Sequence, residues 1–141
     1  MIRALVQRVS RAAVRVDGAT TGAIGPGLLV LLGVTHDDSE EIADRLADKV
    51  RALRVFADVE GRMNEPLGDR EAIVVSQFTL YGDTRKGNRP AYVAAARPEV
   101  AEPLYEHFCA RLDAQRGVFG AHMDVELIND GPVTVPMQMR F

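Results

Sequence analysis

The sequence predicts an α/β domain, residues 1–141, with a mixed, mostly antiparallel sheet and two main helices. Apolar residues dominate two short runs, 27–34 and 72–80, which is typical of strands buried on both faces. Two other stretches, after Ser39 and after Pro98, repeat apolar residues at helical spacing. The resulting order of strands, helix, strand, helix and strands has too few strand–helix alternations for a doubly wound parallel sheet.

The N-terminal part of the chain predicts antiparallel strands followed by a helix. Apolar residues alternate along 2–16, which indicates one strand or a bent pair, and Asp17-Gly18 is a hairpin-turn signal before a short return strand at 20–24. The segment His36-Asp37-Asp38-Ser39 offers oxygens for a helix N-cap, and acidic residues follow in the first turn, where the helix dipole favours them. An amphipathic helix of about four turns then places four residues on its apolar face: Ile42, Leu46, Val50 and Leu53.

The rest of the chain predicts two loops, a second helix and a final pair of strands. Polar residues with glycine and proline predict loops at 58–69 and at 81–90. The second helix is expected after Pro98, and Pro103 fits it only if this proline falls in the first turn. Its apolar face comprises Leu104, Phe108 and Leu112. The C-terminal part is expected to form a strand at 123–128, a turn at 129–132 and a strand at 133–139.

Composition excludes several classes of function. The formal net charge of -3 rules out a polybasic coat for nucleic acid, so any RNA contact must be local. The single cysteine, Cys109, excludes an internal disulfide and a cysteine zinc cage, and it is expected in the core. The histidines fall in no metal motif, so we expect no metal and no cofactor. No apolar run approaches the roughly 20 residues of a membrane helix, and arginines interrupt the N-terminal apolar stretch, unlike in a signal peptide. We therefore expect a cytoplasmic protein without membrane contact.

Polar residues at the end of a very apolar strand mark the first candidate site, Ser76-Gln77-Phe78-Thr79-Leu80. Strand alternation would place Gln77 and Thr79 on one face and the other three side chains on the opposite face. On the pattern alone the ordinary interpretation, a strand leaving the core with exposed threonine and glutamine, is the stronger one.

The second candidate site is the Asn129 to Thr134 segment, which contains Gly131-Pro132. Its ordinary interpretation is a hairpin turn in which Asn and Asp side chains bind nearby backbone. An exposed Gly-Pro turn would nevertheless present bare carbonyl oxygens, which are rigid acceptors for an ammonium group. A cis bond at this position has a low prior expectation.

A basic loop lies between these two segments. Residues 81–97 carry Asp83 against four cations, which is a local charge of +3, and also two tyrosines. The cations are Arg85, Lys86, Arg89 and Arg97. Basic residues with aromatics suit a phosphate backbone and a stacked base, although a solvated loop explains them equally well.

No catalytic constellation accompanies these segments. A nucleophilic Thr79 needs a base within hydrogen-bond reach, and no histidine or carboxylate is adjacent in the sequence. We therefore expect a mechanism of positioning and electrostatics. The same absence leaves open a non-catalytic RNA-binding module and a small-molecule amino-ester hydrolase.

Two long motifs resemble the D-aminoacyl-tRNA deacylase family: SQFTLYGDTRKGNRP at 76–90 and FGAHMDVELINDGPVT at 119–134. The opening MIRALVQRVSRAAVRVDG and the stretch GLLVLLGVTHDD are also similar to the family, so the likeness covers essentially the whole chain. The resemblance implies hydrolysis of the ester between a D-amino acid, or glycine mischarged on tRNA, and the 3′-terminal adenosine of tRNA. It also implies a homodimer in which each subunit inserts Gly131-Pro132, with a cis peptide bond, into the partner's site. Carbonyl oxygens of this turn would hold the α-amino group, and its rigidity would exclude L-side chains by a steric clash.

The resemblance also implies roles for individual residues. Ser76, Gln77, Phe78 and Thr79 match the positions at the scissile ester, where the backbone around Phe78 would donate to the carbonyl oxygen. Arg8 resembles the arginine that braces the Gly-Pro turn. Lys86, Arg89 and Met123 lie where the family receives the terminal adenosine. His122 and Asp124 depart from the pattern, because the family leads us to expect other polar residues beside Met123.

Overall fold

The computed structural model describes residues 1–140. The strands are β1 (Ile2–Val16), β2 (Ala19–Ile24), β3 (Gly27–Gly33), β4 (Phe56–Ala57), β5 (Met63–Glu65), β6 (Glu71–Ser76), β7 (Gln115–Arg116) and β8 (Asp124–Met139). The helices are α1 (Glu40–Ala52) and α2 (Pro98–Leu112), and a short 3-10 helix covers Phe78–Tyr81. Neither α1 nor α2 has the length and apolar composition to cross a membrane.

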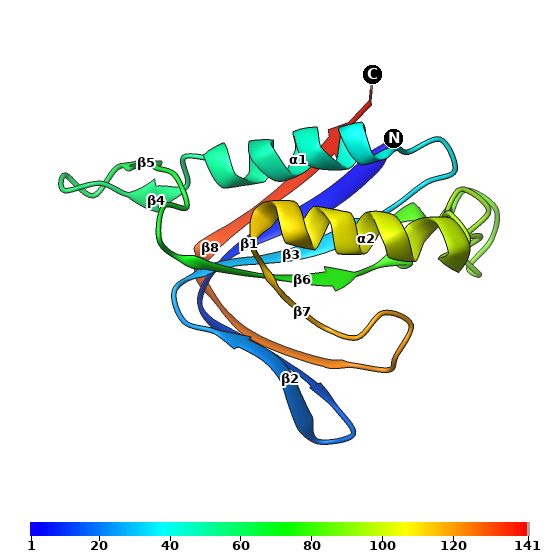
Figure 1. Ribbon diagram of the computed structural model, residues 1–141, viewed down its shortest axis with the longest axis horizontal. Coiled ribbons are helices and arrows are strands. Elements are labelled where there is room, and N and C mark those ends of the chain that lie inside the picture. The colour runs from blue at the N-terminus through cyan, green and yellow to red at the C-terminus, as the bar shows by residue number, and fades with distance from the viewer. Residues whose placement is uncertain (141) are drawn as a thin grey trace.

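The long strand β1 organises a curved sheet with the order β2-β1-β3-β6-β7. One edge of β1 pairs antiparallel with β3 and then with β2, and β8 pairs antiparallel with β1 from Ile2 to Arg15. The contacts of β6 with β3 and with β7 are parallel. The expected mixed, mostly antiparallel sheet is therefore confirmed (Figure 1).

Side-chain alternation in β3 builds two cores on opposite faces of the sheet. Leu28, Val30 and Leu32 point to the face that α1 and α2 cover side by side (Figure 1), where they join the larger core cluster. Leu29 joins a smaller cluster on the opposite face, where Leu31 remains only half-buried. The prediction of a strand buried on both faces is confirmed, but the second face is incompletely covered.

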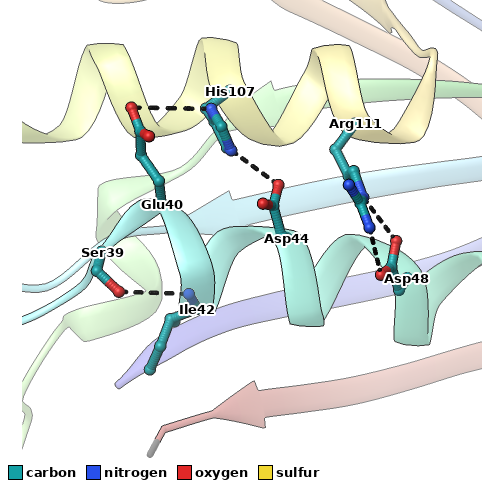
Figure 2. A network of polar contacts seen from close by, with 7 residues as sticks. All are labelled: Ser39, Glu40, Ile42, Asp44, Asp48, His107 and Arg111. Carbon is teal, nitrogen blue, oxygen red and sulfur yellow. Dashed lines mark hydrogen bonds and ion pairs between the residues drawn. The ribbon is translucent and has the colours of Figure 1, made fainter.

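A row of polar side chains joins the two helices outside the core (Figure 2). The hydroxyl of Ser39 accepts the backbone N–H of Ile42 at 3.3 Å, which confirms the expected N-cap of α1. Between the helices, His107 Nε2 lies 2.7 Å from Asp44 Oδ1, and the guanidinium of Arg111 makes two 2.9 Å bonds to the carboxylate of Asp48. These half-exposed contacts contribute little stability, and their main effect is to fix the direction of α2 relative to α1.

Two predicted elements are wrong at their boundaries. Residues 129–132 do not separate two strands, because β8 runs without interruption; they form a bulge in it, called the Gly131-Pro132 turn below, and irregular pairing opposite Gln7, Val9 and Arg11 absorbs the extra residues. The predicted loop 58–69 contains β5, which pairs with β4 as a small hairpin.

Pro103 does not lie in the first turn of α2. The helix begins at Pro98, immediately after an extended Arg97, so Pro103 lies inside it and removes one backbone hydrogen bond. Burial of one face stabilises the helix despite this loss. The buried residues are Ala101, Leu104, Tyr105, Phe108, Cys109 and Leu112.

Candidate active site

The SQFTL segment leaves the sheet earlier than strand alternation predicts. Strand β6 ends at Ser76, and Phe78–Tyr81 forms the 3-10 helix, so Gln77 and Thr79 do not share a strand face. The two side chains nevertheless meet, because the amide Nε2 of Gln77 donates a hydrogen bond to the hydroxyl of Thr79. The structure thus brings Gln77 and Thr79 together by a different route from the expected one.

A close approach to Gly33 makes this turn possible. A Cβ atom at Gly33 would lie 2.9 Å from the ring of Tyr81 and 3.3 Å from the carbonyl oxygen of Gln77, so a larger residue would push the segment off β3. The buried Tyr81 hydroxyl donates to the carbonyl oxygen of Gly33 at 3.1 Å, and burial raises the pKa of this phenol well above its usual value. Arg3 donates to the Leu80 carbonyl oxygen at 2.9 Å and lies over the Tyr81 ring. These contacts therefore hold the Ser76 to Tyr81 segment against β1 and β3.

A cavity of about 590 Å³ opens beside this segment. Ser76, Gln77 and Phe78 form one wall, and the chain before and within the first turns of α2 forms another. The remaining wall comes from the loop between β7 and β8 and the start of β8. The lining residues are Val34, Val75, Ser76, Gln77, Phe78, Tyr92, Ala95, Ala96, Pro98, Ala101, Phe119, Gly120, Ala121, His122, Met123 and Val125. A mostly apolar cavity of this size with a few polar groups has the form of a small-ligand site.

Two exposed aromatic rings stand at this cavity. Phe78 is 56% exposed, and its ring packs edge-to-face against Tyr92 with centroids 5.1 Å apart. An aromatic pair that remains this accessible offers a surface on which a planar ligand can stack.

The basic loop is closed at its base and charged at its tip. Asp83 and Ala91 exchange backbone hydrogen bonds of 2.8 and 2.9 Å. The Arg85 guanidinium binds the Asp83 carboxylate and lowers its pKa to about 2, so these two charges compensate each other. Lys86 and Arg89 are exposed and have no acidic partner among residues 1–140. Together with the exposed Arg97, which also has no acidic partner among these residues, they are the charges that residues 81–97 offer to a ligand.

Met123 anchors the third wall of the cavity. Its sulfur accepts the backbone N–H of Val118 at 3.4 Å, and it fills the space that a Cβ atom at Gly117 would need. Between Gly117 and Met123 the chain makes a turn, which is closed by a hydrogen bond from the Ala121 N–H to the Val118 carbonyl oxygen. The neighbouring His122 is exposed and also lines the cavity.

The Gly131-Pro132 segment is exposed, and its peptide bond is cis. The side chain of Asn129 bridges it, accepting from the Val133 N–H at 2.8 Å and donating to the Val133 carbonyl oxygen at 3.2 Å. Arg8 donates to the Asp130 carbonyl oxygen at 2.7 Å and to the Val55 carbonyl oxygen at 2.6 Å. The guanidinium therefore ties this turn to the sheet and to the chain that enters β4.

Within one subunit the Gly131-Pro132 turn does not reach the cavity. It contributes nothing to the cavity lining, and it lies beside Arg8, which is level with Leu28 in β3. Ser76 is level with Leu32, which is four residues farther along β3, or roughly 13 Å. The two sequence-predicted candidate sites are therefore separate in the single chain.

The described residues contain no nucleophile–base pair at the cavity. No histidine or carboxylate bonds to Thr79, whose recorded side-chain partner is Gln77. Cys109 lies fully buried in the core, as expected, and burial raises the pKa of its thiol to about 12. Across residues 1–140 no group of three or more His, Cys, Asp and Glu side chains has an arrangement that could hold a metal ion. The chemistry available here is positioning by amide, hydroxyl and backbone groups.

Sequence reasoning missed much of the cavity wall. Ala95, Ala96 and Ala101 line it, yet each is an ordinary residue for its local segment. The segment with Ala95 and Ala96 reaches the site by folding against Val34, with a hydrogen bond from the Ala96 N–H to the Val34 carbonyl oxygen at 2.9 Å. Because that contact is long-range, no local pattern could have indicated them.

The cavity has mostly apolar walls with a few amide and hydroxyl groups, and no nucleophile–base pair of residues 1–140 lines it. The family described as D-Tyr-tRNA(Tyr) deacylase matches residues 5–138, and the chain belongs to this family. The expected family, and with it the expected enzyme class of hydrolase acting on an aminoacyl-tRNA ester, is confirmed.

Similar proteins cover nearly the whole chain. The D-aminoacyl-tRNA deacylase of Symbiobacterium thermophilum is 56% identical over 96% of this chain and 94% of its own. The protein of the same name from Anaeromyxobacter dehalogenans is 56% identical over 99% of this chain and 98% of its own.

Solved structures share the fold. A structure described as c-Myc DNA Unwinding Element Binding Protein has a TM-score of 0.90 at 38% identity, covering 96% of this chain and 97% of that one. A probable eukaryotic D-amino acid tRNA deacylase has a TM-score of 0.83 at 16% identity, with 96% and 98% coverage, and this likeness concerns the fold alone.

Proposed function

We propose that this protein hydrolyses the ester between a D-amino acid and the 3′-terminal adenosine of tRNA, and that it also accepts glycine mischarged on tRNA. The observation that carries the proposal is the cavity beside Ser76, Gln77 and Phe78, in a chain that matches a deacylase family from residue 5 to residue 138. The substrate is a cytoplasmic molecule, and the cytoplasm is where we expect the protein to act.

The terminal adenosine would occupy the apolar cavity. Phe78, Tyr92 and Met123 provide surface for a base and a ribose. Outside the cavity, Lys86 and Arg89 carry uncompensated charge suited to the phosphates of the preceding nucleotides. This arrangement would place the aminoacyl ester against the Gln77–Phe78 wall.

The chemistry would then depend on orientation. The N–H of Phe78 is the first of the 3-10 helix and has no partner within that helix, so it is suited to stabilise the developing charge on the ester carbonyl oxygen. Water, activated with the help of the ribose 2′-hydroxyl, adds to the carbonyl carbon. The bond to the 3′-oxygen breaks, that oxygen takes a proton, and the amino acid leaves. Gln77 and Thr79 would position the ester, and Thr79 would not act as a nucleophile.

The chirality filter would come from a second copy of the chain. The Gly131-Pro132 turn is exposed and lies outside the cavity lining, and it is level with the opposite end of β3 from the cavity. A two-fold axis between these ends would bring each turn to the partner's cavity. The half-buried Leu5 and Leu31, on the incompletely covered face of the sheet, suit such an interface. There the turn would bind the α-amino group and exclude L-side chains.

A test compares release of D-tyrosine and L-tyrosine from the two Tyr-tRNAs, with enzyme far below substrate and with chelator present. Rapid release from the D-ester alone supports the proposal, and release from neither ester or from both contradicts it. Sedimentation should give about twice 15.4 kDa. A fully active monomer would contradict the shared site.

A second candidate is a nucleic-acid-binding module without turnover. The 38% identical structure described as c-Myc DNA Unwinding Element Binding Protein favours it, as does the absence of a nucleophile–base pair at the cavity formed by the described residues. The same experiment separates the two candidates, because a binding module protects the ester and an enzyme releases many amino acids per subunit.

A further inference from the structure

His122 has no role in the proposal so far, although it stands at the site. It lines the same cavity as Gln77 and Phe78, and its side chain is exposed. No hydrogen bond or ion pair involves it within the part of the chain that the structure describes. The other two histidines are engaged elsewhere: His36 bonds to the Val93 carbonyl oxygen, and His107 bonds to Asp44.

The loop that carries His122 is fixed. Met123 follows it directly and is locked against Gly117 and the Val118 N–H, and Ala121 precedes it in a turn closed at 3.2 Å to the Val118 carbonyl oxygen. The backbone at His122 is therefore held on both sides. A side chain on a backbone held in this way binds a ligand with little loss of backbone freedom.

The charges along the cavity lining indicate which kind of ligand group His122 would bind. Apart from His122, the lining consists of apolar side chains, one glycine, and the uncharged polar groups of Ser76, Gln77 and Tyr92. No carboxylate lines the cavity, and the nearby Asp124 lies outside the lining. An imidazole donates a hydrogen bond in its neutral form and carries positive charge when protonated, so it suits an anion.

We propose that His122 binds the 5′-phosphate of the terminal nucleotide of the tRNA substrate. The inference rests on the proposed function, since it takes the apolar interior of the cavity as the place of the base. A base on the Phe78–Tyr92 surface leaves its phosphate near the cavity opening, where the exposed imidazole stands. His122 is then a substrate-binding residue that lowers KM and leaves the chemical step unchanged.

The test measures kcat and KM for two substrates. One is D-Tyr-tRNA, and the other is adenosine esterified with D-tyrosine, which has no phosphate. His122→Ala is expected to raise KM for D-Tyr-tRNA about tenfold at unchanged kcat. The same variant is expected to leave both constants for the adenosine ester unchanged. His122→Lys, which supplies a fixed positive charge, is expected to restore KM for D-Tyr-tRNA to within about threefold of the original value.

A matched control is His107→Ala, which removes a histidine from the polar contacts between α1 and α2 (Figure 2). This variant should leave KM for both substrates unchanged. Three outcomes would overturn the inference: an unchanged KM for D-Tyr-tRNA in His122→Ala, an equal rise with the phosphate-free ester, or a lysine variant as defective as the alanine variant. Failure of the original enzyme to hydrolyse D-Tyr-tRNA would instead refute the proposed function, so the two failures are distinguishable.

Discussion

The two candidate segments are held by different parts of the molecule. The wall at Ser76 to Tyr81 is fastened to the core by the buried Tyr81 ring, by Arg3 and by close packing on Gly33. The Gly131-Pro132 turn lies exposed on β8, where the pairing of β8 with β1 flanks it and hydrogen bonds with Arg8 and Asn129 hold it. The wall completes a cavity within its own subunit, whereas the turn lies outside that cavity. This difference supports a site assembled from two copies of the chain.

The largest effect is expected from Gly131→Ala. A Cβ atom there would lie 2.8 Å from the Val133 nitrogen and 3.2 Å from Arg8 Nη2, and the φ of +149° disfavours an L-side chain. Displacement of the turn by even a fraction of an ångström should lower kcat/KM for D-Tyr-tRNA about 100-fold. Steady-state deacylation measures this loss. Gly61→Ala is a useful comparison, because that glycine lies outside the cavity lining and has nothing within 4 Å of the added atom, although its φ of +80° also adds strain. Equal losses in the two variants would contradict the special role of the turn.

The next effect concerns Arg8, which should act by positioning the turn. Arg8→Ala removes the bonds to the Asp130 and Val55 carbonyl oxygens and should reduce kcat/KM for D-Tyr-tRNA about tenfold. Because the turn becomes mobile, the ratio of D-ester to L-ester hydrolysis should fall as well. Parallel assays on both esters measure the ratio. A loss of D-activity with an unaltered ratio would assign Arg8 a merely structural role.

A small effect is expected for Thr79→Ala. The threonine hydroxyl is bonded to Gln77 and has no base, so its removal should change kcat less than about threefold. Single-turnover deacylation gives the chemical rate directly. Complete loss of turnover with substrate binding intact would restore the nucleophile hypothesis and contradict substrate-assisted hydrolysis.

The smallest effect on turnover is expected from loss of the Asp83–Arg85 ion pair, where the basic loop begins. Arg85 lowers the pKa of Asp83 to about 2, so the ion pair contributes fully above the ordinary pKa of an aspartate, about 4, and is lost as the pH falls toward 2. Turnover should therefore show no dependence on this pair between pH 5 and pH 8, roughly the range where most proteins work. Asp83→Asn should speed tryptic cleavage after Arg85 at neutral pH. Unchanged cleavage would show that the Asp83–Ala91 backbone bonds alone order the loop.

The sequence predicted local features well and long-range ones poorly. The N-cap at Ser39 and the doubly buried β3 follow from neighbouring residues, and both were predicted. The early end of β6 depends on the missing side chain at Gly33, 43 residues before Ser76, and was missed. The continuity of β8 through residues 129–132 likewise depends on a partner strand at the other end of the chain.

The candidate site was predictable only in part. Gln77 and Phe78 were found because polar residues follow an apolar strand, and the Gly-Pro segment because it resembles a family motif. Nothing local indicated the alanines of the cavity wall, since small apolar residues are common in any fold. The separation of the two segments in one chain could be seen only once the register of β1, β3 and β6 was known.

The central claim, that each site combines two subunits, is tested most directly by complementation. One chain carries Gln77→Ala and Phe78→Ala, which remove side chains of the cavity wall, and the other carries Gly131→Ala; each alone should be nearly inactive. In a mixed dimer with shared sites, one site regains an intact wall and an intact turn. Co-refolded or co-expressed chains should therefore recover about a quarter of the original D-Tyr-tRNA activity, since half of the dimers are mixed and each has one intact site. If the mixture stays as inactive as its components while sedimentation confirms mixed dimers, the turn acts within its own subunit and the account is wrong.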